Sequence, residues 1–218
     1  MEHFSKEDGE KLILECFRVL KPGGVLRIAI PDLEVIAKNY LHYINEGMNN
    51  QDDEIIRANY EWMLLEMYDQ TVRNQSGGNM GKYLKQNEII NEDFVLQRIG
   101  AEGQVLRDEF LKPSIAVASN NLLISYSKQL KSILKGIIKK VFKPYISYEI
   151  GAFRKGGEIH QWMYDRYSLT NLLRAKGGSD IIIRDAFSSY IKEWATYEID
   201  GKYPITRKPD SLFMEALK

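Results

Sequence analysis

The sequence predicts an α/β fold that combines part of an open, doubly wound sheet with a large helical insertion. Three observations predict it. A helix pattern, a Lys-Pro-Gly-Gly turn and an apolar strand pattern follow one another in residues 6–30. The same order of helix, Gly turn and strand returns at 167–185, whereas residues 35–150 show only helical spacing. We therefore expect an α/β core from residues 1–34 and 151–218, and a mostly helical insertion or cap at 35–150.

The composition fits one globular domain, or one domain with an insertion. The chain has 218 residues, 44% of them hydrophobic, and can bury a sizeable core. Its 30 basic and 30 acidic residues balance, which argues against a nucleic-acid partner. The single cysteine, Cys16, excludes an internal disulfide and is typical of a reducing compartment. No signal-peptide pattern and no run of 18 apolar residues is present, so we expect a cytoplasmic protein.

The first helix and strand have clear boundaries. Ser5 is a suitable N-cap, and apolar residues recur at helical spacing after it. Residues 21–24, Lys-Pro-Gly-Gly, end the helix because Pro cannot continue it and Gly adopts the left-handed turn. Val25–Ile30 is short, branched and apolar apart from Arg27, as expected of a strand inside a parallel sheet. Asp32 then lies at the carboxyl edge, where open α/β sheets bind ligands.

The middle of the chain is read as helical, without strands. The sequence predicts helices at 33–43, 53–72, 91–99 and, more weakly, 102–110, with a Gly-rich loop at 76–81. A long amphipathic helix is expected at Leu122–Phe142. Residues 110–148 hold seven lysines and no acid, so this helix is either a packed cap with solvated lysines or a peripheral contact with an anionic membrane.

The α/β pattern resumes in the last third of the chain. The sequence predicts a helix at 167–175, a Gly turn at 176–178 and a strand at 180–185. A final strand is expected at 212–217, after an irregular or hairpin connection at 188–209.

These motifs resemble a known family. The Glu-His-Phe, helix, Lys-Pro-Gly-Gly, strand and Pro-Asp series of residues 2–32 looks like the region from just after the fourth strand through the fifth strand of class I S-adenosylmethionine-dependent methyltransferases. It is similar to the bacterial group linked to surface-glycan biosynthesis. Residues 69–80, 160–165 and 207–215 are similar to signatures of one subgroup. The resemblance implies the C-terminal part of a Rossmann-like methyltransferase sheet, with S-adenosyl-L-methionine as cofactor and a hydroxyl or amine of a glycan as acceptor.

The chain departs from the family pattern at the cofactor. These enzymes hold S-adenosylmethionine largely with their first three strands, through a Gly-rich turn between a strand and a helix. The Gly pairs at 23–24, 77–78, 156–157 and 177–178 do not have that setting. We therefore expect that the cofactor-binding N-terminal half is absent from this chain. The alternative is an inactive fragment or split-protein subunit, which binds a separate N-terminal half or a second copy through the exposed edge of the strand that begins at Val25.

Three candidate site residues lie in the first block. The resemblance places Glu2 and His3 at a strand tip that faces the transferred methyl group, while a frayed terminus without a role is the alternative. Asp32 is a candidate for substrate contact or for removal of an acceptor proton. The alternative for Asp32 is an N-cap of the next helix, for which Asp is well suited.

A second group of candidates lies in the second block. Asp69 and Arg73 share a helix face at a spacing of four residues, with Gln70 beside them, and can form an ion pair. If that face lines the cleft, Arg73 would clamp a phosphate or carboxylate of the substrate. A solvated salt bridge is the alternative.

His160 is the candidate general base. It precedes Trp162 and Tyr164, and a near-neutral pKa would suit removal of a hydroxyl proton before methyl transfer. A structural histidine in an aromatic cluster is the alternative. Tyr164 is a candidate substrate contact, and His42 is expected to be structural. No spacing of His, Cys, Asp or Glu along the sequence resembles a metal site.

Overall fold

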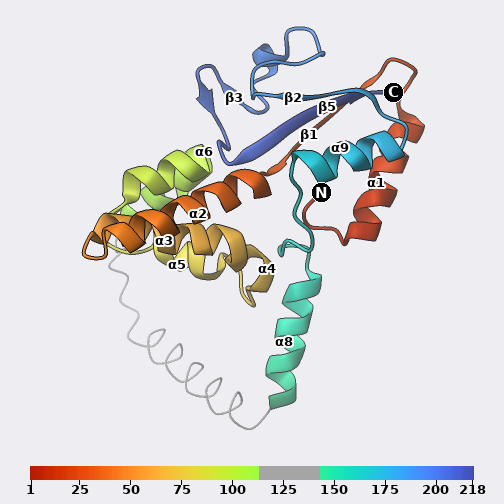
Figure 1. The fold of residues 1–218 in the computed structure, drawn as a ribbon. Helices are drawn as coiled ribbons and strands as arrows, with labels where there is room; N and C mark the ends of the chain where they lie inside the picture. Colours follow the sequence, from red (N-terminus) through yellow and green to blue (C-terminus); the bar gives the residue numbers. More distant parts are fainter. Residues whose placement is uncertain (113–142) are drawn as a thin grey trace, which may run out of the picture.

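The computed structural model describes residues 1–112 and 143–218 (Figure 1). The helices are α1 Lys6–Val19, α2 Leu33–Asn49, α3 Glu54–Leu64, α4 Gln70–Val72, α5 Gly78–Leu84, α6 Glu92–Leu111, α8 Lys143–Lys155 and α9 Arg166–Ala175, with a π-helical turn η1 Leu65–Asp69 and a 3-10 turn η2 Trp194–Tyr197. The strands are β1 Val25–Pro31, β2 Ser179–Arg184, β3 Gly201–Lys202, β4 Ile205–Thr206 and β5 Ser211–Leu217. The helix expected at Leu122–Phe142 lies outside the described residues. None of the helices that the structure describes is both long and apolar enough to cross a membrane.

The main sheet has three strands in the order β1-β5-β2, and both outer strands are antiparallel to β5. The expected α/β class is confirmed, but the expectation that β1 lies inside a parallel sheet is wrong. The last strand returns between β1 and β2, which therefore run in the same direction without pairing to each other. An apolar strand has the same composition beside parallel and antiparallel neighbours, so its sequence could not distinguish the two. Among the described strands, none pairs with the second edge of β1.

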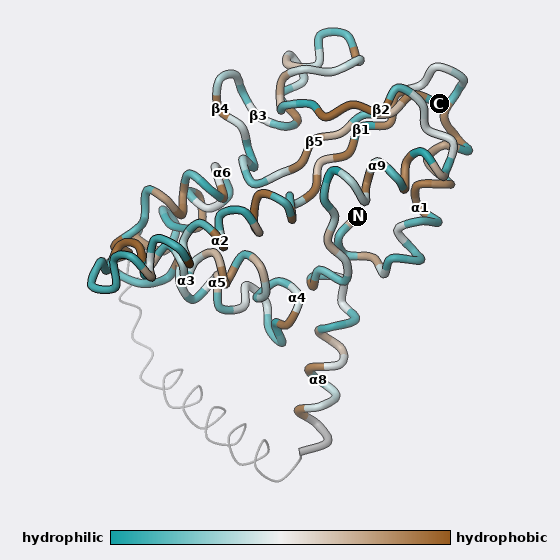
Figure 2. Tube along the Cα trace, viewed as in Figure 1, coloured by the Kyte–Doolittle hydropathy of each residue, from teal (hydrophilic) through white to brown (hydrophobic). Residues whose placement is uncertain are grey.

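One face of this sheet is covered by α1 and α9 (Figure 1). Ile13 and Phe17 from α1 and Leu169 and Leu173 from α9 are at most 4% exposed. They pack against alternate residues of β1 and β5, and Figure 2 shows the hydrophobic character of these strands. The strand residues are Ile28, Ile30, Leu212, Met214 and Ala216. This apolar cluster fixes β1 and therefore the position of the loop at its carboxyl end.

The opposite face of the sheet explains the single charge in β1. Arg27 is buried under the segment after β2, where its guanidinium donates to Asp200 at 2.8 Å and to Glu215 at 2.9 Å. The guanidinium also lies 4.6 Å from the ring centroid of Trp194. Glu215 is fully buried and also accepts from Arg184 at 3.1 Å. A buried charge network of this kind is tolerated because its members satisfy one another.

The helical middle of the chain has a second apolar core, centred on Trp62, Met63 and Val95, which are fully buried. The helices expected at 33–43 and 53–72 are confirmed, and α2 continues to Asn49. The two helices expected at 91–99 and 102–110 are confirmed as the two parts of α6, which are separated at Gly100, where the backbone is not helical and φ is 68°. The predicted division into core and insertion remains a prediction, although each apolar core draws its buried residues from one side of that division.

The loop expected at 76–81 is confirmed only at residues 76–77, because α5 begins at Gly78. The carboxylate of Asp69 accepts hydrogen bonds from the backbone N–H groups of Asn79 at 2.8 Å and Met80 at 3.2 Å. These two groups belong to the first turn of the helix and have no partner within it. The cap comes from a different helix ten residues earlier, so local composition did not show it.

The last third of the chain agrees with expectation. Asp165 and Ser168 form a capping box that starts α9, and β2 and β5 lie at the predicted strands. The connection between them contains η2 and the short β3–β4 hairpin.

Candidate functional site

The carboxyl end of β1 is the meeting point of several predicted residues. Asp32 follows β1 directly, forms an isolated bridge with Tyr164, and donates its backbone N–H to the carbonyl of Asp210 at 3.0 Å. Its carboxylate accepts from the N–H groups of Glu34 at 2.9 Å and Val35 at 3.2 Å, so Asp32 is the N-cap of α2. Burial raises the pKa of Asp32, and the two backbone bonds offset only part of that effect. The side chain therefore has a structural function at this position.

Glu2, His3 and His160 form the most concentrated cluster of titratable side chains at this end of the molecule. One donor atom from each of them lies within 4.8 Å of the others. Nε2 of His3 is 3.5 Å from Oε1 of Glu2. The rings of His3 and His160 meet edge to face, with centroids 4.9 Å apart. His160 is 6% exposed, and its Nδ1 atom has no hydrogen-bond partner among the described residues.

Backbone hydrogen bonds hold the three residues of this cluster in place. The carbonyl of Glu2 accepts from the N–H groups of Gln161 at 2.7 Å and Trp162 at 3.2 Å. The side-chain amide of Gln161 donates to the carbonyl of His3 at 2.8 Å. The N–H of His160 donates to the carbonyl of Gln70 at 2.9 Å. The segment that carries Glu2 and His3 is therefore fixed to residues 160–162, and these to the helical part.

The electrostatics of the cluster differ from the sequence expectation. Burial lowers the pKa of His160 to about 4, even though the charge of Glu2 raises it in part, so the ring is neutral at pH 7. The expectation of a near-neutral pKa is wrong because it did not include desolvation of the imidazolium. Burial raises the pKa of Glu2, but its own backbone N–H and the Met1 amine, 3.2 Å away, outweigh this and lower it overall. Glu2 is therefore a carboxylate at pH 7.

The second group of predicted residues is a buried ion-pair cluster. Arg73 lies 3.6 Å from the carboxylate of Asp69, as its helix spacing predicts, and donates to Glu158 at 3.0 Å. Asp69 is 3% exposed, so the pair is not the solvated salt bridge that was the alternative. Glu158 also accepts from the N–H of Gly77 at 3.0 Å. Both carboxylates thus bind Arg73 and backbone N–H groups at the start of α5, which gives the group a structural function.

Tyr164 is part of the apolar cluster that contains α1 and α9, and it is 3% exposed. Its hydroxyl has no hydrogen-bond partner in the part of the chain that the structure describes. The hydroxyl faces α1 closely, since a Cβ atom added to Gly9 would lie 2.6 Å from it. The structure does not bring this hydroxyl to the His160 cluster by any described contact.

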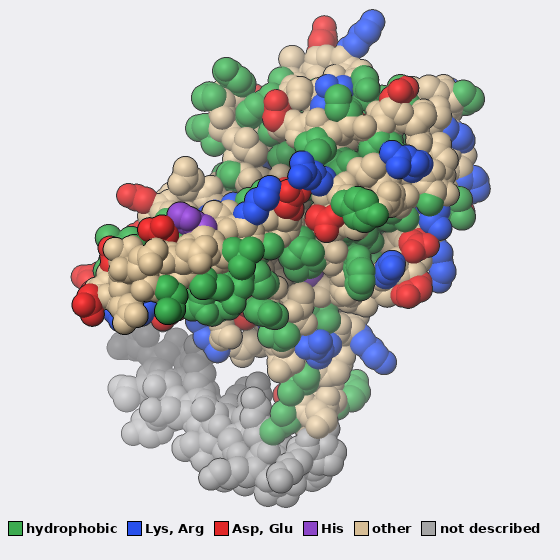
Figure 3. Space-filling view, in the orientation of Figure 1, with side chains coloured by type: hydrophobic (Ala, Val, Ile, Leu, Met, Phe, Trp, Pro, Cys, Tyr) green, Lys and Arg blue, Asp and Glu red, His purple; other side chains and the backbone are tan. Residues whose placement is uncertain are grey.

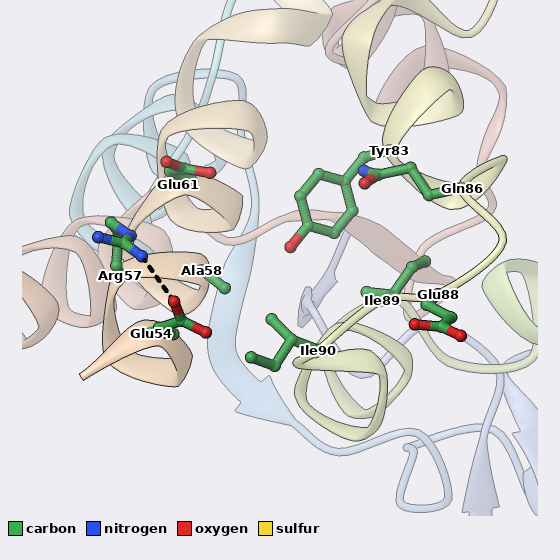
Figure 4. A pocket seen from close by; sticks show the side chains of 9 residues that line it. All are labelled: Glu54, Arg57, Ala58, Glu61, Tyr83, Gln86, Glu88, Ile89 and Ile90. Carbon is green, nitrogen blue, oxygen red and sulfur yellow. Dashed lines mark hydrogen bonds and ion pairs between the residues drawn. The ribbon is translucent and has the colours of Figure 1, made fainter. Parts of the chain in front are cut away.

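Two hollows help to locate a ligand. One of about 230 Å³ is lined by polar residues beside the ion-pair cluster, among them Asp69, Arg73 and Lys82. Another of about 750 Å³ lies between α3 and residues 83–90, and Figure 4 shows the Tyr83 ring facing it across from Glu61. None of the sequence-predicted site residues lines the larger hollow. On the face shown in Figure 3, basic and acidic side chains are interspersed.

The described residues do not fit S-adenosylmethionine as the family holds it. In residues 1–112 and 143–218, β1 is followed directly by Asp32 and α2, and β2 by an irregular segment. The turns at Gly23 and Gly177, both with positive φ, precede strands instead of following them. The close backbone approach that such a cofactor needs is therefore not built by these residues.

No family model, curated protein or solved structure matches this chain. The geometry therefore has to define the site by itself. Sequence reasoning missed Glu158, whose only signal in the sequence is its position two residues before the motif at 160–165. It also missed the cluster of Glu2, His3 and His160, because His160 is far from the other two residues along the chain.

Proposed function

We propose that the described residues form the acceptor-binding part of an S-adenosylmethionine-dependent methyltransferase that acts on a hydroxyl or amine of a glycan. The observation that carries the proposal is the meeting of four sequence blocks at the carboxyl end of β1. These blocks are 2–32, 69–80, 160–165 and 207–215, and the resemblance to methyltransferases depends on them.

Three backbone hydrogen bonds join these blocks in pairs. Gln161 donates to Glu2, His160 to Gln70, and Asp32 to Asp210. Residues that are dispersed in sequence but meet at the end of a strand are the usual way in which α/β folds build a site. This arrangement supports the view that the blocks act together, and not that each is a separate packing motif.

Within the proposal, the described residues position the acceptor and hold its proton. His160 is the base candidate, because its neutral ring has a free lone pair and its Nδ1 has no partner among the described residues. Glu2 lies beside it and would stabilise the imidazolium that forms when the hydroxyl proton is accepted. The polar hollow beside Asp69 and Arg73 is the candidate position for the remainder of the acceptor. The cofactor is held by residues other than those described.

A second candidate function is that of a binding subunit, and the free edge of β1 favours it. Among the described strands, only β5 pairs with β1, so a row of backbone N–H and C=O groups is left on its other edge. Such edges pair readily with a further strand. The partner would be a separate cofactor-binding half or a second copy of the chain.

Calorimetric titration of S-adenosylmethionine tests the proposal. We expect no binding in the micromolar range by the 218-residue chain, and micromolar binding by a chain that also carries the residues encoded directly upstream of Met1. Micromolar binding by the short chain would refute the claim about the cofactor cradle. Absence of binding by both chains would leave only the binding-subunit function, which sedimentation velocity tests as self-association.

A further inference from the structure

We propose that Glu2, His3 and His160 form a binding site for a divalent transition-metal ion, with Zn²⁺ as the reference ion. The inference goes beyond methyl transfer and does not depend on it. Two imidazoles and one carboxylate are a donor set that suits Zn²⁺ and related ions. Donor atoms of the three side chains lie within 4.8 Å of one another.

The hydrogen bond of His3 prepares its ring for metal binding. Nδ1 of His3 lies 3.3 Å from the carbonyl oxygen of Ile159. A carbonyl only accepts, so Nδ1 carries the proton and Nε2 of the neutral ring has a free lone pair. This arrangement, with one ring nitrogen bound to a carbonyl and the other directed at the metal, is typical of metal-binding histidines. Nε2 is also the atom that faces Glu2.

The separations between the donor atoms are close to those of a metal site. Bonds of about 2.0–2.1 Å in tetrahedral geometry place neighbouring donor atoms about 3.4 Å apart. Nε2 of His3 and Oε1 of Glu2 are already 3.5 Å apart. His160 completes the group, in which one donor atom from each side chain lies within 4.8 Å of the others. The three donors would have to approach one another by up to about 1.4 Å to surround an ion, with a fourth position left for water or a ligand.

The buried His160 supports the same conclusion. A buried nitrogen without a partner costs free energy unless another group satisfies it, and Nδ1 of His160 is such an atom among the described residues. The backbone bonds from His160 and Gln161 also hold the site rigid before any ion binds.

The donor set selects the kind of metal. Glu2 is the only acid among the three side chains, and the other two donors are imidazole nitrogens. Ca²⁺ and Mg²⁺ need several oxygen ligands and are disfavoured here. Zn²⁺, Ni²⁺ and Cu²⁺ bind imidazole strongly enough for this set. A bound metal would occupy the lone pair of His160, so His160 could not then accept a proton from the acceptor hydroxyl. The metal would instead lower the pKa of a hydroxyl bound to it.

The test is a zinc titration of the tag-free, chelator-treated 218-residue chain at pH 7, in competition with a chromogenic chelator. We expect one equivalent of Zn²⁺ to bind with a Kd of about 1 µM or tighter. His160→Gln, His3→Gln and Glu2→Gln should each weaken binding by about 100-fold or more. The chain has three histidines and one cysteine, so His42→Gln and Cys16→Ser together remove every other imidazole and thiol donor. Both controls should keep the wild-type affinity.

Several outcomes would overturn the proposal. Wild-type affinity weaker than about 100 µM, or an equal loss in His42→Gln and His160→Gln, is incompatible with it. Unchanged affinity in both histidine variants of the cluster would show that the zinc binds elsewhere on the chain. Circular dichroism checks each variant for folding. His3 is 42% exposed, so His3→Gln provides the decisive comparison if His160→Gln does not fold.

Discussion

The imidazole rings of His3 and His160 meet edge to face, with centroids 4.9 Å apart and an angle of 82° between their planes. His3 belongs to the first residues of the chain and His160 to the segment that returns to the sheet, and the carbonyl of Gln70 anchors His160 from the helical part. This contact places the first residues of the chain, the return to the sheet and the helical part at one site. The cluster therefore belongs to the candidate site, whereas the neighbouring Asp69–Arg73 pair stabilises the fold.

Asp69→Ala should destabilise the fold strongly. The Asp69 carboxylate is buried, caps the first turn of α5 with two backbone bonds and faces Arg73. Its removal leaves two N–H groups without partners and leaves Arg73 paired with Glu158 alone, at a cost of about 3–5 kcal/mol in the free energy of unfolding. Urea denaturation measures this.

The matched control for Asp69 is Asp53→Ala. Asp53 also accepts two backbone N–H bonds, at the start of α3, but it does so at an exposed position. We expect a loss of about 1 kcal/mol there. Equal losses at the two positions would show that burial and the Arg73 contact contribute nothing.

Arg27→Ala should cost about 3–5 kcal/mol, because it leaves the fully buried Glu215 with less compensation. Arg18→Ala removes an arginine that pairs with Glu15 at 2.7 Å, but at the surface of α1. That control should change stability by about 1 kcal/mol or less. Denaturant titrations measure the free energy of unfolding of both variants. A loss in Arg27→Ala as small as that in Arg18→Ala would contradict the prediction.

Gly9 and Tyr164 should be energetically coupled. Gly9→Ala normally stabilises a helix, but its new Cβ would lie 2.6 Å from the Tyr164 hydroxyl. We therefore expect Gly9→Ala to destabilise by about 1–3 kcal/mol in the wild-type chain. In a Tyr164→Phe background the same change should be neutral or stabilising, because the nearest remaining ring carbon lies 3.9 Å away. A double-mutant cycle without coupling would disprove the contact.

Stability should fall with rising pH through the titration of Asp210. Burial raises the pKa of Asp210 from its ordinary value of 3.8 to about 6, although the charge of Lys208 lowers it in part. The protonated form is favoured in the folded state, so its contribution is fully present below about pH 4 and is lost as the pH rises through about 6.

The comparison with Asp210→Asn isolates this effect, because Asn does not titrate. Between pH 4 and pH 7 the free energy of unfolding of the wild type should decrease relative to the variant by up to about 3 kcal/mol. Urea titrations at several pH values measure the difference, with Asp52→Asn, at an exposed turn, as the background. A constant difference across this range would contradict the assignment.

The local elements could be predicted from the sequence, because their signals are local. Ser5 caps α1, the Gly turn ends at β1, and Asp165 with Ser168 starts α9, each within a few residues. Asp32 is likewise the N-cap of the following helix, which is one of the two roles that the sequence suggests for it.

Long-range relationships could not be predicted in the same way. The sequence of β1 does not show that β5 pairs antiparallel beside it, and the start of α5 depends on a carboxylate from another helix. The cluster of Glu2, His3 and His160 has no spacing signal, because folding alone brings its members together. The neutral state of His160 follows from burial, which composition does not reveal.

The most direct test of the central claim, that Glu2, His3 and His160 act as one site, is nitrogen-15 NMR of the histidine rings during addition of Zn²⁺. We expect one equivalent to shift Nε2 of His3 and one ring nitrogen of His160 together, while Nδ1 of His3 keeps its proton and His42 is unchanged. A shift of His42 alone, or no shift of His3 and His160, would show that the three side chains do not form a metal site.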